Sequence, residues 1–212
     1  MTRFIEYTCK HYDKLIRALL EHLQMVGLTL LISIALAFVI SVLIMDRKCA
    51  ADWVMRICSM IYAIPSLALF ALLIPLTGLG MKTAVIVLVI YNQYILVRSF
   101  TEGFCRIEAG VLEAASGMGM TRWQIFKKVR FPLALDSMTA GIHIAIISTI
   151  GIATIGATIG AGGLGSVLFD GMRTQNAVKI VWGTILSAAL VLLANAVLKA
   201  VEKRVKKAVY HV

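Results

Sequence analysis

The stretch LQMVGLTLLISIALAFVISVLIM, residues 23–45, contains no charged side chain and sets the fold class. An α-helix needs about 20 apolar residues to cross the hydrocarbon core of a bilayer, and this stretch is long enough. Of the 212 residues, 60% are hydrophobic and 15% charged, which exceeds what a soluble core of this size needs. We therefore predict an all-α integral membrane protein with five transmembrane helices, because four further uncharged runs follow at residues 57–81, 83–97, 137–169 and 180–198.

The third and fourth of these five spans depart from the length of a simple crossing. Residues 83–97 are too few, but Lys82 and Arg98 can extend their side chains towards the interface, so we predict a helix over about 78–100. The run 137–169 is too long for one straight helix, and its surplus, residues 159–169, is rich in glycine. Because glycine breaks helices and lets the backbone turn, this surplus is predicted to form a re-entrant or surface turn.

The basic residues are divided unevenly between the two sides of this topology. Of the 21 lysines and arginines, 14 fall on the side that holds the long loop 101–136, and 7 fall on the opposite side. Loops on the cytoplasmic side of a membrane carry the excess of positive charge. The N-terminus is therefore expected outside, and the C-terminus and the long loop in the cytoplasm. This distribution accounts for the net charge of +10 without a nucleic acid partner.

Three regions follow from these patterns. Residues 1–22 are predicted to form an external amphipathic helix that lies in the membrane interface, or alternatively a solvated helix that packs on a partner. Residues 23–198 form the transmembrane domain, with a cytoplasmic loop at about 101–136, and residues 199–212 form a cytoplasmic basic tail. The amphipathic pattern rests on apolar side chains at helical spacing, which are Tyr12, Leu15, Ile16, Leu19, Leu20 and Leu23.

The cytoplasmic loop has the signals of two short helices joined by a turn. Thr121 and Gln124 form a capping-box pattern at the start of the second helix, and Pro132 is expected to end it before the fourth span. The first helix is rich in small side chains, which permit close approach to another surface. That surface belongs either to a partner chain or to this chain's own bundle. The small residues are Ala114, Ala115, Ser116, Gly117 and Gly119.

In this loop the sequence resembles the permeases of ATP-binding-cassette importers. Their loop carries Glu-Ala-Ala, three residues, Gly, nine residues and then Ile-x-Leu-Pro, and in this chain Val129 and Phe131 replace the Ile and the Leu. The resemblance implies a type I importer permease fold, similar to that of methionine permeases, in which the first loop helix inserts into a groove on the ATPase. It assigns ATPase coupling to Glu113, Ala114, Ala115, Gly117, Met118, Gly119 and Pro132.

The same resemblance implies a set of partners and a location. ATP and Mg bind to separate cytoplasmic ATPase subunits, so this chain is expected to bind no cofactor itself. A second permease subunit, either identical or a paralogue, completes the pathway. An extracellular or lipid-tethered binding protein captures the substrate. The implied location is the bacterial cell (inner) membrane, with lipid around the spans.

Within that family the chain is most similar to osmoprotectant permeases, which import quaternary amines such as glycine betaine, carnitine and choline. Two positions depart from that branch, because Ser99 replaces an Asn and Ser166 replaces an acidic residue. Methionine or other small amino-acid importers share several features and remain the alternative. The supporting stretches are Ile64–Leu69, Ile74–Leu76, Gly78–Gly80, Arg98, Thr101–Gly103, Gly117–Thr121 and Ile159–Gly165.

The candidate pathway residues are aromatic, proline, serine and glycine residues within or next to the predicted spans. Tyr62, Tyr91, Tyr94 and Trp182 could hold a quaternary ammonium ion by cation–π attraction, although belt or packing roles are the alternative. The polar residues Asn92, Gln93, His143 and Asn195 are expected to make packing hydrogen bonds. The residues assigned to a pathway or gate are Pro65, Ser66, Tyr91, Gly160, Gly162, Gly163 and Gly165.

Enzyme and metal chemistry have little support in the sequence. The spans contain no paired carboxylates, and Cys9, Cys49, Cys58 and Cys105 are far apart, so neither a catalytic site nor a metal site is predicted. The glycines at 160, 162 and 165 match a dinucleotide motif but follow an apolar span rather than a strand. A membrane channel is the remote alternative to an importer, and only the glycine turn could supply filter carbonyls for it.

Overall fold

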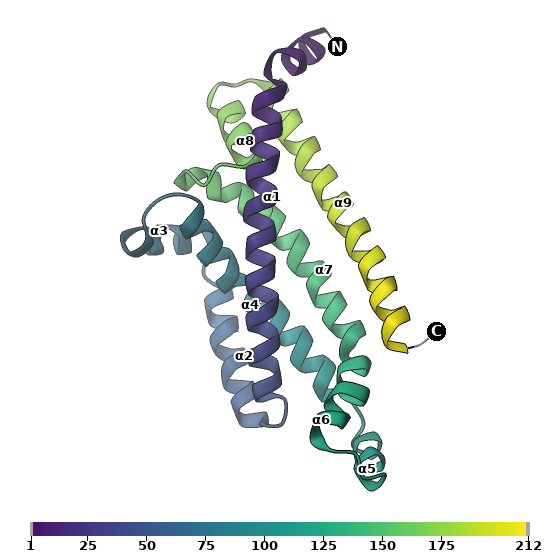
Figure 1. Ribbon diagram of the computed structural model, residues 1–212. Coiled ribbons are helices and arrows are strands. Elements are labelled where there is room, and N and C mark those ends of the chain that lie inside the picture. The colour runs from purple at the N-terminus through teal and green to yellow at the C-terminus, as the bar shows by residue number, and fades with distance from the viewer. Residues whose placement is uncertain (1, 211–212) are drawn as a thin grey trace.

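The computed structural model describes residues 2–210, and every regular element in that range is a helix (Figure 1). Four helical stretches are long and apolar enough to cross a membrane, and one bent helix pair can supply a fifth crossing. The predicted all-α membrane fold with about five spans is confirmed. The elements are α1 (Thr2–Ile44), α2 (Lys48–Tyr62), α3 (Ser66–Thr77), α4 (Met81–Cys105), α5 (Ala109–Gly117), α6 (Arg122–Ile125), η1 (Phe126–Arg130), α7 (Phe131–Ile155), η2 (Gly156–Ile159), α8 (Leu164–Arg173) and α9 (Ala177–Tyr210).

The second crossing differs from the single helix expected over residues 57–81. The chain forms α2 and α3, which meet at 95°, and α2 begins earlier, at Lys48. Pro65 causes the break, because proline has no N–H to donate and pushes the preceding residue out of the helical region. Its backbone is extended, with φ −56° and ψ 134°. The two helices therefore form either one broken span or a re-entrant loop.

The core of the bundle is built around α4. Both α1 and α7 pack along it, and its side chains are the most buried of the spans. A polar contact lies inside this core, where Asn92 donates to Oγ1 of Thr149 at 2.8 Å and to Oγ of Ser33 at 3.4 Å. The expectation that Asn92 makes packing hydrogen bonds is confirmed. Several apolar side chains of the core are almost completely buried, among them Phe70, Leu88, Leu96, Phe100 and Ile150.

The other three polar residues of the spans differ from one another. Gln93 donates to the carbonyl of Val89 at 3.1 Å, and Nδ1 of His143 lies 3.1 Å from the carbonyl oxygen of Thr139. Oδ1 of Asn195 is buried and has no hydrogen-bond partner among residues 7–207, whose side chains the structure describes. Gln93 also donates to the carbonyl of Ser33 in α1 at 3.4 Å, so its expected packing hydrogen bond is confirmed. The contact of His143 stays within its own helix, α7, and this oxygen of Asn195 makes none.

The glycine-rich segment turns as the sequence predicts. After α7 the chain passes through η2 and then through Gly160, Gly162 and Gly163, which all have φ between +75° and +78°. A side chain with a Cβ rarely adopts this conformation, so glycine is required at these positions. The short helix α8 follows, and α9 then returns along the bundle (Figure 1).

The N-terminal helix bends at a different place from the expected boundary after residue 22. The bend falls at His11, where φ is −130° and ψ is 18°, and the helix continues without a break from there to Ile44. In the segment 12–22, Leu15 is buried against the bundle, whereas Tyr12, Ile16 and Leu20 are exposed. This segment is therefore part of the straight helix that forms the first span.

Pro132 does not end a helix, so this part of the prediction is wrong. The stretches α6, η1 and α7 are continuous, and Pro132 lies in the first turn of α7. In a regular α-helix the proline ring collides with the carbonyl four residues earlier. Here a π-helical turn precedes it, with the N–H of Phe131 bonded to the carbonyl of Phe126, and this wider turn accommodates the proline.

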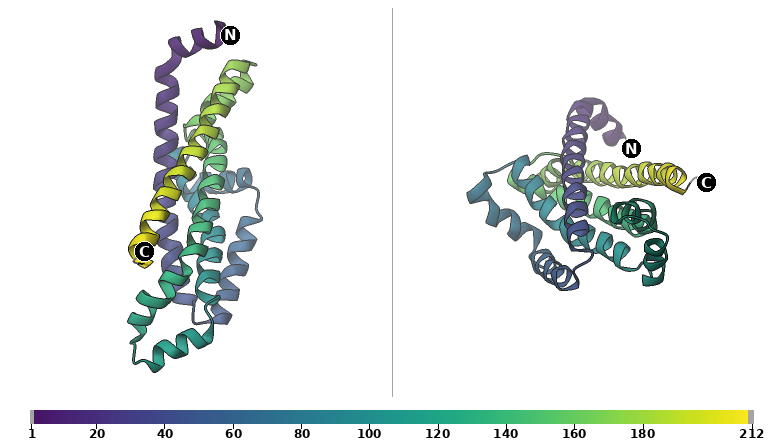
Figure 2. Two further views of the ribbon diagram at one scale, coloured as in Figure 1. Left: turned by 90° about the vertical axis from the view of Figure 1, so that its right-hand side faces the viewer. Right: turned by 60° about the horizontal axis from the view of Figure 1, so that its bottom comes forward.

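The loop helices and the glycine turn lie at opposite ends of the molecule. Figure 2 shows α5 and α6 projecting beyond one end of the bundle, while α8 and the N-terminus lie towards the other. The C-terminal part of α9 runs back towards the end that carries the loop. The structure thus separates a loop end from a glycine-turn end.

Candidate docking loop and translocation pathway

The helix α5 exposes much of its surface. Glu113, Ala114 and Gly117 are all exposed, and Met118, which caps the end of the helix, is 75% exposed. No ion pair involves Glu113 among the described residues. An exposed helix of small side chains flanked by an acidic and a flexible apolar side chain can insert into a groove of another chain.

Gly119 has a local structural role. Its φ is +78°, and no atom lies within 4 Å of the position that a Cβ would take. The N–H of Met120 donates to the carbonyl oxygen of Ala115 at 3.2 Å. The N–H of Gly119 donates to the carbonyl oxygen of Ser116 at 2.9 Å. These two bonds form a Schellman motif, which ends α5. Glycine is thus favoured at position 119 by the left-handed backbone of this cap and not by a close contact within the chain.

Ala115 faces its own chain. Its exposure is 2%, the lowest in α5. The alternative that small residues pack within this chain therefore holds for Ala115, while its neighbours Ala114 and Gly117 face outwards. A bulky side chain at position 115 would distort the loop itself.

The second loop helix begins with the predicted capping box. The N–H of Gln124 donates to Oγ1 of Thr121 at 3.3 Å, and the N–H of Thr121 donates to Oε1 of Gln124 at 2.8 Å. These bonds satisfy two backbone donors at a helix end. They fix the direction in which α6 leaves the turn.

An aromatic cluster that the sequence analysis missed connects the loop to the spans. Phe126 lies at its centre, with ring centroids 5.8 Å from Trp123, 5.9 Å from Phe104, 6.4 Å from Phe38 and 6.4 Å from Phe131. Phe38 belongs to α1 and Phe104 to α4, so the ring joins three parts of the chain. Such ring pairs stabilise packing beyond the area that they bury.

An ion pair strengthens the same junction. Nη1 of Arg130 lies 2.7 Å from Oδ1 of Asp46, which follows the end of α1. Arg130 is largely covered, with a side-chain exposure of 18%. Together with the Phe126 cluster, this contact ties the base of the loop to the nearby ends of α1 and α4.

Three of the four aromatic pathway candidates come together. The ring of Tyr62 lies 5.5 Å from that of Tyr91 and 4.8 Å from that of Tyr94, and Trp182 lies in α9, outside this group. The hydroxyl of Tyr91 donates to the carbonyl of Ile64 at the break between α2 and α3. Pro65 and Ser66 begin the next helix, so these candidates share one region.

A cleft opens beside this group, between α2 and α4. It has a volume of about 720 Å³, and its lining includes Trp53, Arg56, Tyr94, Arg98 and Glu102. Arg98 donates to Glu102 at 2.9 Å and to the Tyr94 hydroxyl at 3.0 Å. The Arg56 guanidinium lies 5.9 Å from the ring centre of Trp53. The cleft therefore combines aromatic faces with charges of both signs.

The glycine turn is clamped by three other parts of the bundle. Oε2 of Glu21 accepts the N–H of Gly163 at 3.0 Å, and the N–H of Gly80 donates to the carbonyl of Ile159 at 2.9 Å. At Gly165 an added Cβ would lie 1.9 Å from the carbonyl oxygen of Thr154. The four predicted glycines are thus brought together with α1, the start of α4 and the end of α7.

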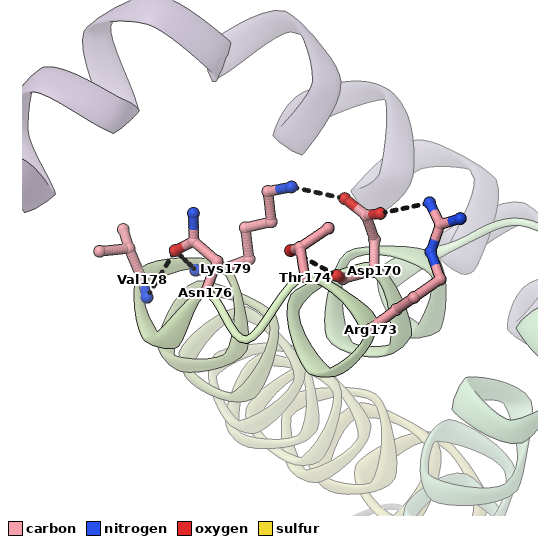
Figure 3. Close-up of polar contacts among 6 residues, drawn as sticks. All are labelled: Asp170, Arg173, Thr174, Asn176, Val178 and Lys179. Carbon is pink, nitrogen blue, oxygen red and sulfur yellow. Dashed lines mark hydrogen bonds and ion pairs between the residues drawn. The ribbon is translucent and has the colours of Figure 1, made fainter.

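An ion cluster locks α8 to the start of α9, as Figure 3 shows. Asp170 is bonded to Nζ of Lys179 at 2.6 Å and to Nη2 of Arg173 at 3.0 Å, and these two cations, Lys179 first, hold the pKa of the Asp170 carboxyl below its usual range. Oδ1 of Asn176 accepts the N–H groups of Val178 and Lys179, which caps α9. The glycine turn therefore leads into a fixed helical hairpin.

A multi-span bundle with an exposed loop helix at one end and a clamped glycine turn at the other has the architecture of a transporter permease. Residues 29–207 match the family described as "Binding-protein-dependent transport system inner membrane component". The chain belongs to this family of inner-membrane permeases. The resemblance that the loop motif suggested is confirmed.

Several characterised relatives cover most of the chain. The carnitine transport permease protein OpuCD of Listeria monocytogenes serotype 1/2a (strain 10403S) is 32% identical over 204 residues, which is 96% of this chain and 92% of the relative. The glycine betaine/carnitine/choline transport system permease protein OpuCD of Bacillus subtilis (strain 168) is 34% identical over 165 residues, covering 77% of this chain and 72% of the relative.

A solved structure supports the same fold. An inward-facing structure of the MetNI methionine ABC transporter has a chain that aligns with a TM-score of 0.80 at 25% identity, over 93% of this chain and 97% of that one. The predicted type I importer permease fold is therefore confirmed.

Proposed function

We propose that this chain forms the membrane pathway of an ATP-driven importer for a small quaternary amine such as glycine betaine, carnitine or choline. The similarity to osmoprotectant permeases over most of the chain is the observation that carries this proposal. The ligands that those names give share a trimethylammonium group, which has no hydrogen-bond donor to offer. Aromatic faces are the protein surfaces that attract such a group.

The exposed docking helix supports coupling to a separate ATPase. The helix α5 projects from the loop end of the bundle and presents Glu113, Ala114, Gly117 and Met118 (Figure 2). The Phe126 cluster and the ion pair of Arg130 with Asp46 then provide a rigid path from that helix into α1 and α4. Hydrolysis of ATP with Mg on the partner would thereby move the spans.

The pathway and gate assignments extend this proposal. The cleft between α2 and α4, next to Tyr62, Tyr94 and the break at Pro65, offers aromatic faces to an ammonium group and Arg56 to a carboxylate. The glycine turn lies towards the opposite end of the bundle, where a binding protein would release its substrate. A second permease subunit would close the open side of the cleft.

Uptake into vesicles tests the function. The permease is reconstituted with the ATPase and the binding protein that co-purify with it, and labelled glycine betaine, carnitine, choline and methionine are each offered with ATP. We expect accumulation of at least one quaternary amine above its external concentration, and none without ATP. A Tyr62→Leu variant should slow this uptake without changing the affinity of the binding protein. Accumulation of methionine alone would instead indicate an amino-acid importer. Passage that does not depend on ATP would indicate a channel.

Thiol labelling tests the proposed orientation, in which the N-terminus lies outside. Three exposed cysteines can report on the two sides of the membrane. Cys9 lies near the start of α1, whereas Cys49, at the start of α2, and Cys105, at the end of α4, lie at the opposite end of the bundle. A membrane-impermeant maleimide added to intact cells should label Cys9, whereas Cys49 and Cys105 should react only after permeabilisation. Single-cysteine variants assign each signal. Labelling of Cys105 in intact cells would reverse the proposed topology.

A further inference from the structure

An apolar groove runs along the outside of the bundle between α1 and α9. Its volume is about 500 Å³, and every side chain that lines it is aliphatic. Ile146 of α7 and Leu190 of α9 are buried and form its floor. Leu19 and Leu23 of α1 form one wall. Figure 1 shows α7 between α1 and α9, the two helices that supply most of the groove lining.

The groove is open on its outer side, where no other part of the described chain covers it. The apolar part of α9 is 11% buried, against 61% for α4. Leu193 and Val197, which line the groove, are 65% and 63% exposed. Leu186 and Val201 mark its extent along α9, and at about 1.5 Å per residue this length is roughly 22 Å. The occupant is therefore a long, apolar body that lies within the membrane.

The same face of α9 becomes basic where the groove ends. The groove residues follow helical spacing through Val197 and Val201, and the next position on that face is Arg204, with Lys207 beside it. Both side chains are exposed, and no carboxylate lies within ion-pair distance of either among the described residues. By contrast, Lys206 faces the bundle and is paired with Asp136 at 2.6 Å and with Glu202 at 2.8 Å.

We propose that this groove is a binding site for an anionic phospholipid. An acyl chain lies along the groove, and the headgroup phosphate is held by Arg204 and Lys207 in the leaflet on the side of the C-terminus. Guanidinium groups bind phosphate oxygens in a bidentate manner, and basic clusters next to a span attract anionic headgroups. A phospholipid meets both requirements of the site, because it is apolar along its length and anionic at one end.

Lipid retention measured by native mass spectrometry tests this site. The full-length permease, with the chains that co-purify with it, is equilibrated with phosphatidylglycerol or with phosphatidylethanolamine of identical acyl chains. We expect preferential retention of phosphatidylglycerol. Arg204→Gln and Lys207→Gln should each lower it roughly fivefold. Lys199→Gln is the matched control, since Lys199 is exposed on the side of α9 that faces away from the groove, and it should retain wild-type levels.

A second variant tests the groove separately from the charges. Ala194→Phe fills the groove from its wall, and it should lower retention of both lipids while gel filtration and the melting temperature show a folded protein. If Ala194→Phe misfolds, the charge variants still decide the question. Equal retention of the two lipids, with no effect of Arg204→Gln, would overturn the proposal. So would an intersubunit disulfide through Leu193→Cys in a background without the native cysteines, because a second copy would then occupy the groove.

Discussion

Replacement of Glu113 by arginine is expected to abolish substrate accumulation while the permease still inserts and the binding protein still binds its ligand. Glu113 is exposed on α5 and makes no ion pair among the described residues, so the change leaves the fold of this chain intact. An inverted charge in the proposed docking surface leaves a partner group unpaired, which costs roughly 2–5 kcal/mol. The ATPase should therefore bind at least about thirtyfold more weakly.

Co-purification of the ATPase with a tagged permease measures this effect directly. Asp13→Arg is the matched control, because Asp13 is also exposed and makes no ion pair with residues 7–207, but lies in the N-terminal helix, away from the loop. That variant should retain the ATPase at wild-type levels. If Glu113→Arg also retains it and accumulates substrate normally, α5 is not the docking element.

Gly165→Ala is expected to cause the largest loss of folded, active permease of any single methyl addition. The added Cβ would lie 1.9 Å from the carbonyl oxygen of Thr154, which is backbone and cannot rotate away. Overpacking typically costs about 1–3 kcal/mol when neighbouring side chains can adjust, and this site has no such freedom. We therefore expect Gly165→Ala to lower the free energy of unfolding by more than about 3 kcal/mol. The glycine turn should also move away from the end of α7.

The melting temperature in detergent and the uptake rate in vesicles report this change. Gly151→Ala is the control, since Gly151 lies in α7, close to Thr154, and no atom lies within 4 Å of the position that its added Cβ would take. Alanine favours helix over glycine by up to about 1 kcal/mol, so this variant should be at least as stable as the wild type. A normal melting temperature and normal uptake for Gly165→Ala would remove the glycine turn from the proposed gate.

Local signals explain why much of this molecule follows from its sequence. Uncharged runs predict spans because a charged side chain is costly in the bilayer core. The capping box at Thr121 and the turn at Gly160 are also local, because their hydrogen bonds and backbone angles involve residues close in the chain. The loop motif at Glu113 is likewise contained in one short segment.

Other features depend on residues that are distant in the chain, and they became visible only in the folded bundle. Phe126 packs against Phe38, and Glu21 accepts the N–H of Gly163, contacts between segments that no local pattern relates. The exposure of Ala114 and the burial of Ala115 depend on how α5 lies against its neighbours.

Two of the three prolines, Pro65 and Pro132, show the same contrast between local sequence and packing. The sequence predicts a helix end at Pro132, but the π-helical turn before it lets the helix continue, whereas Pro65 does break its helix. Proline chemistry is identical at both positions. The surrounding helix geometry determines whether the missing N–H and the bulky ring end a helix. Protein class, spans and loop signals therefore follow from local sequence, and the junctions between them follow from packing.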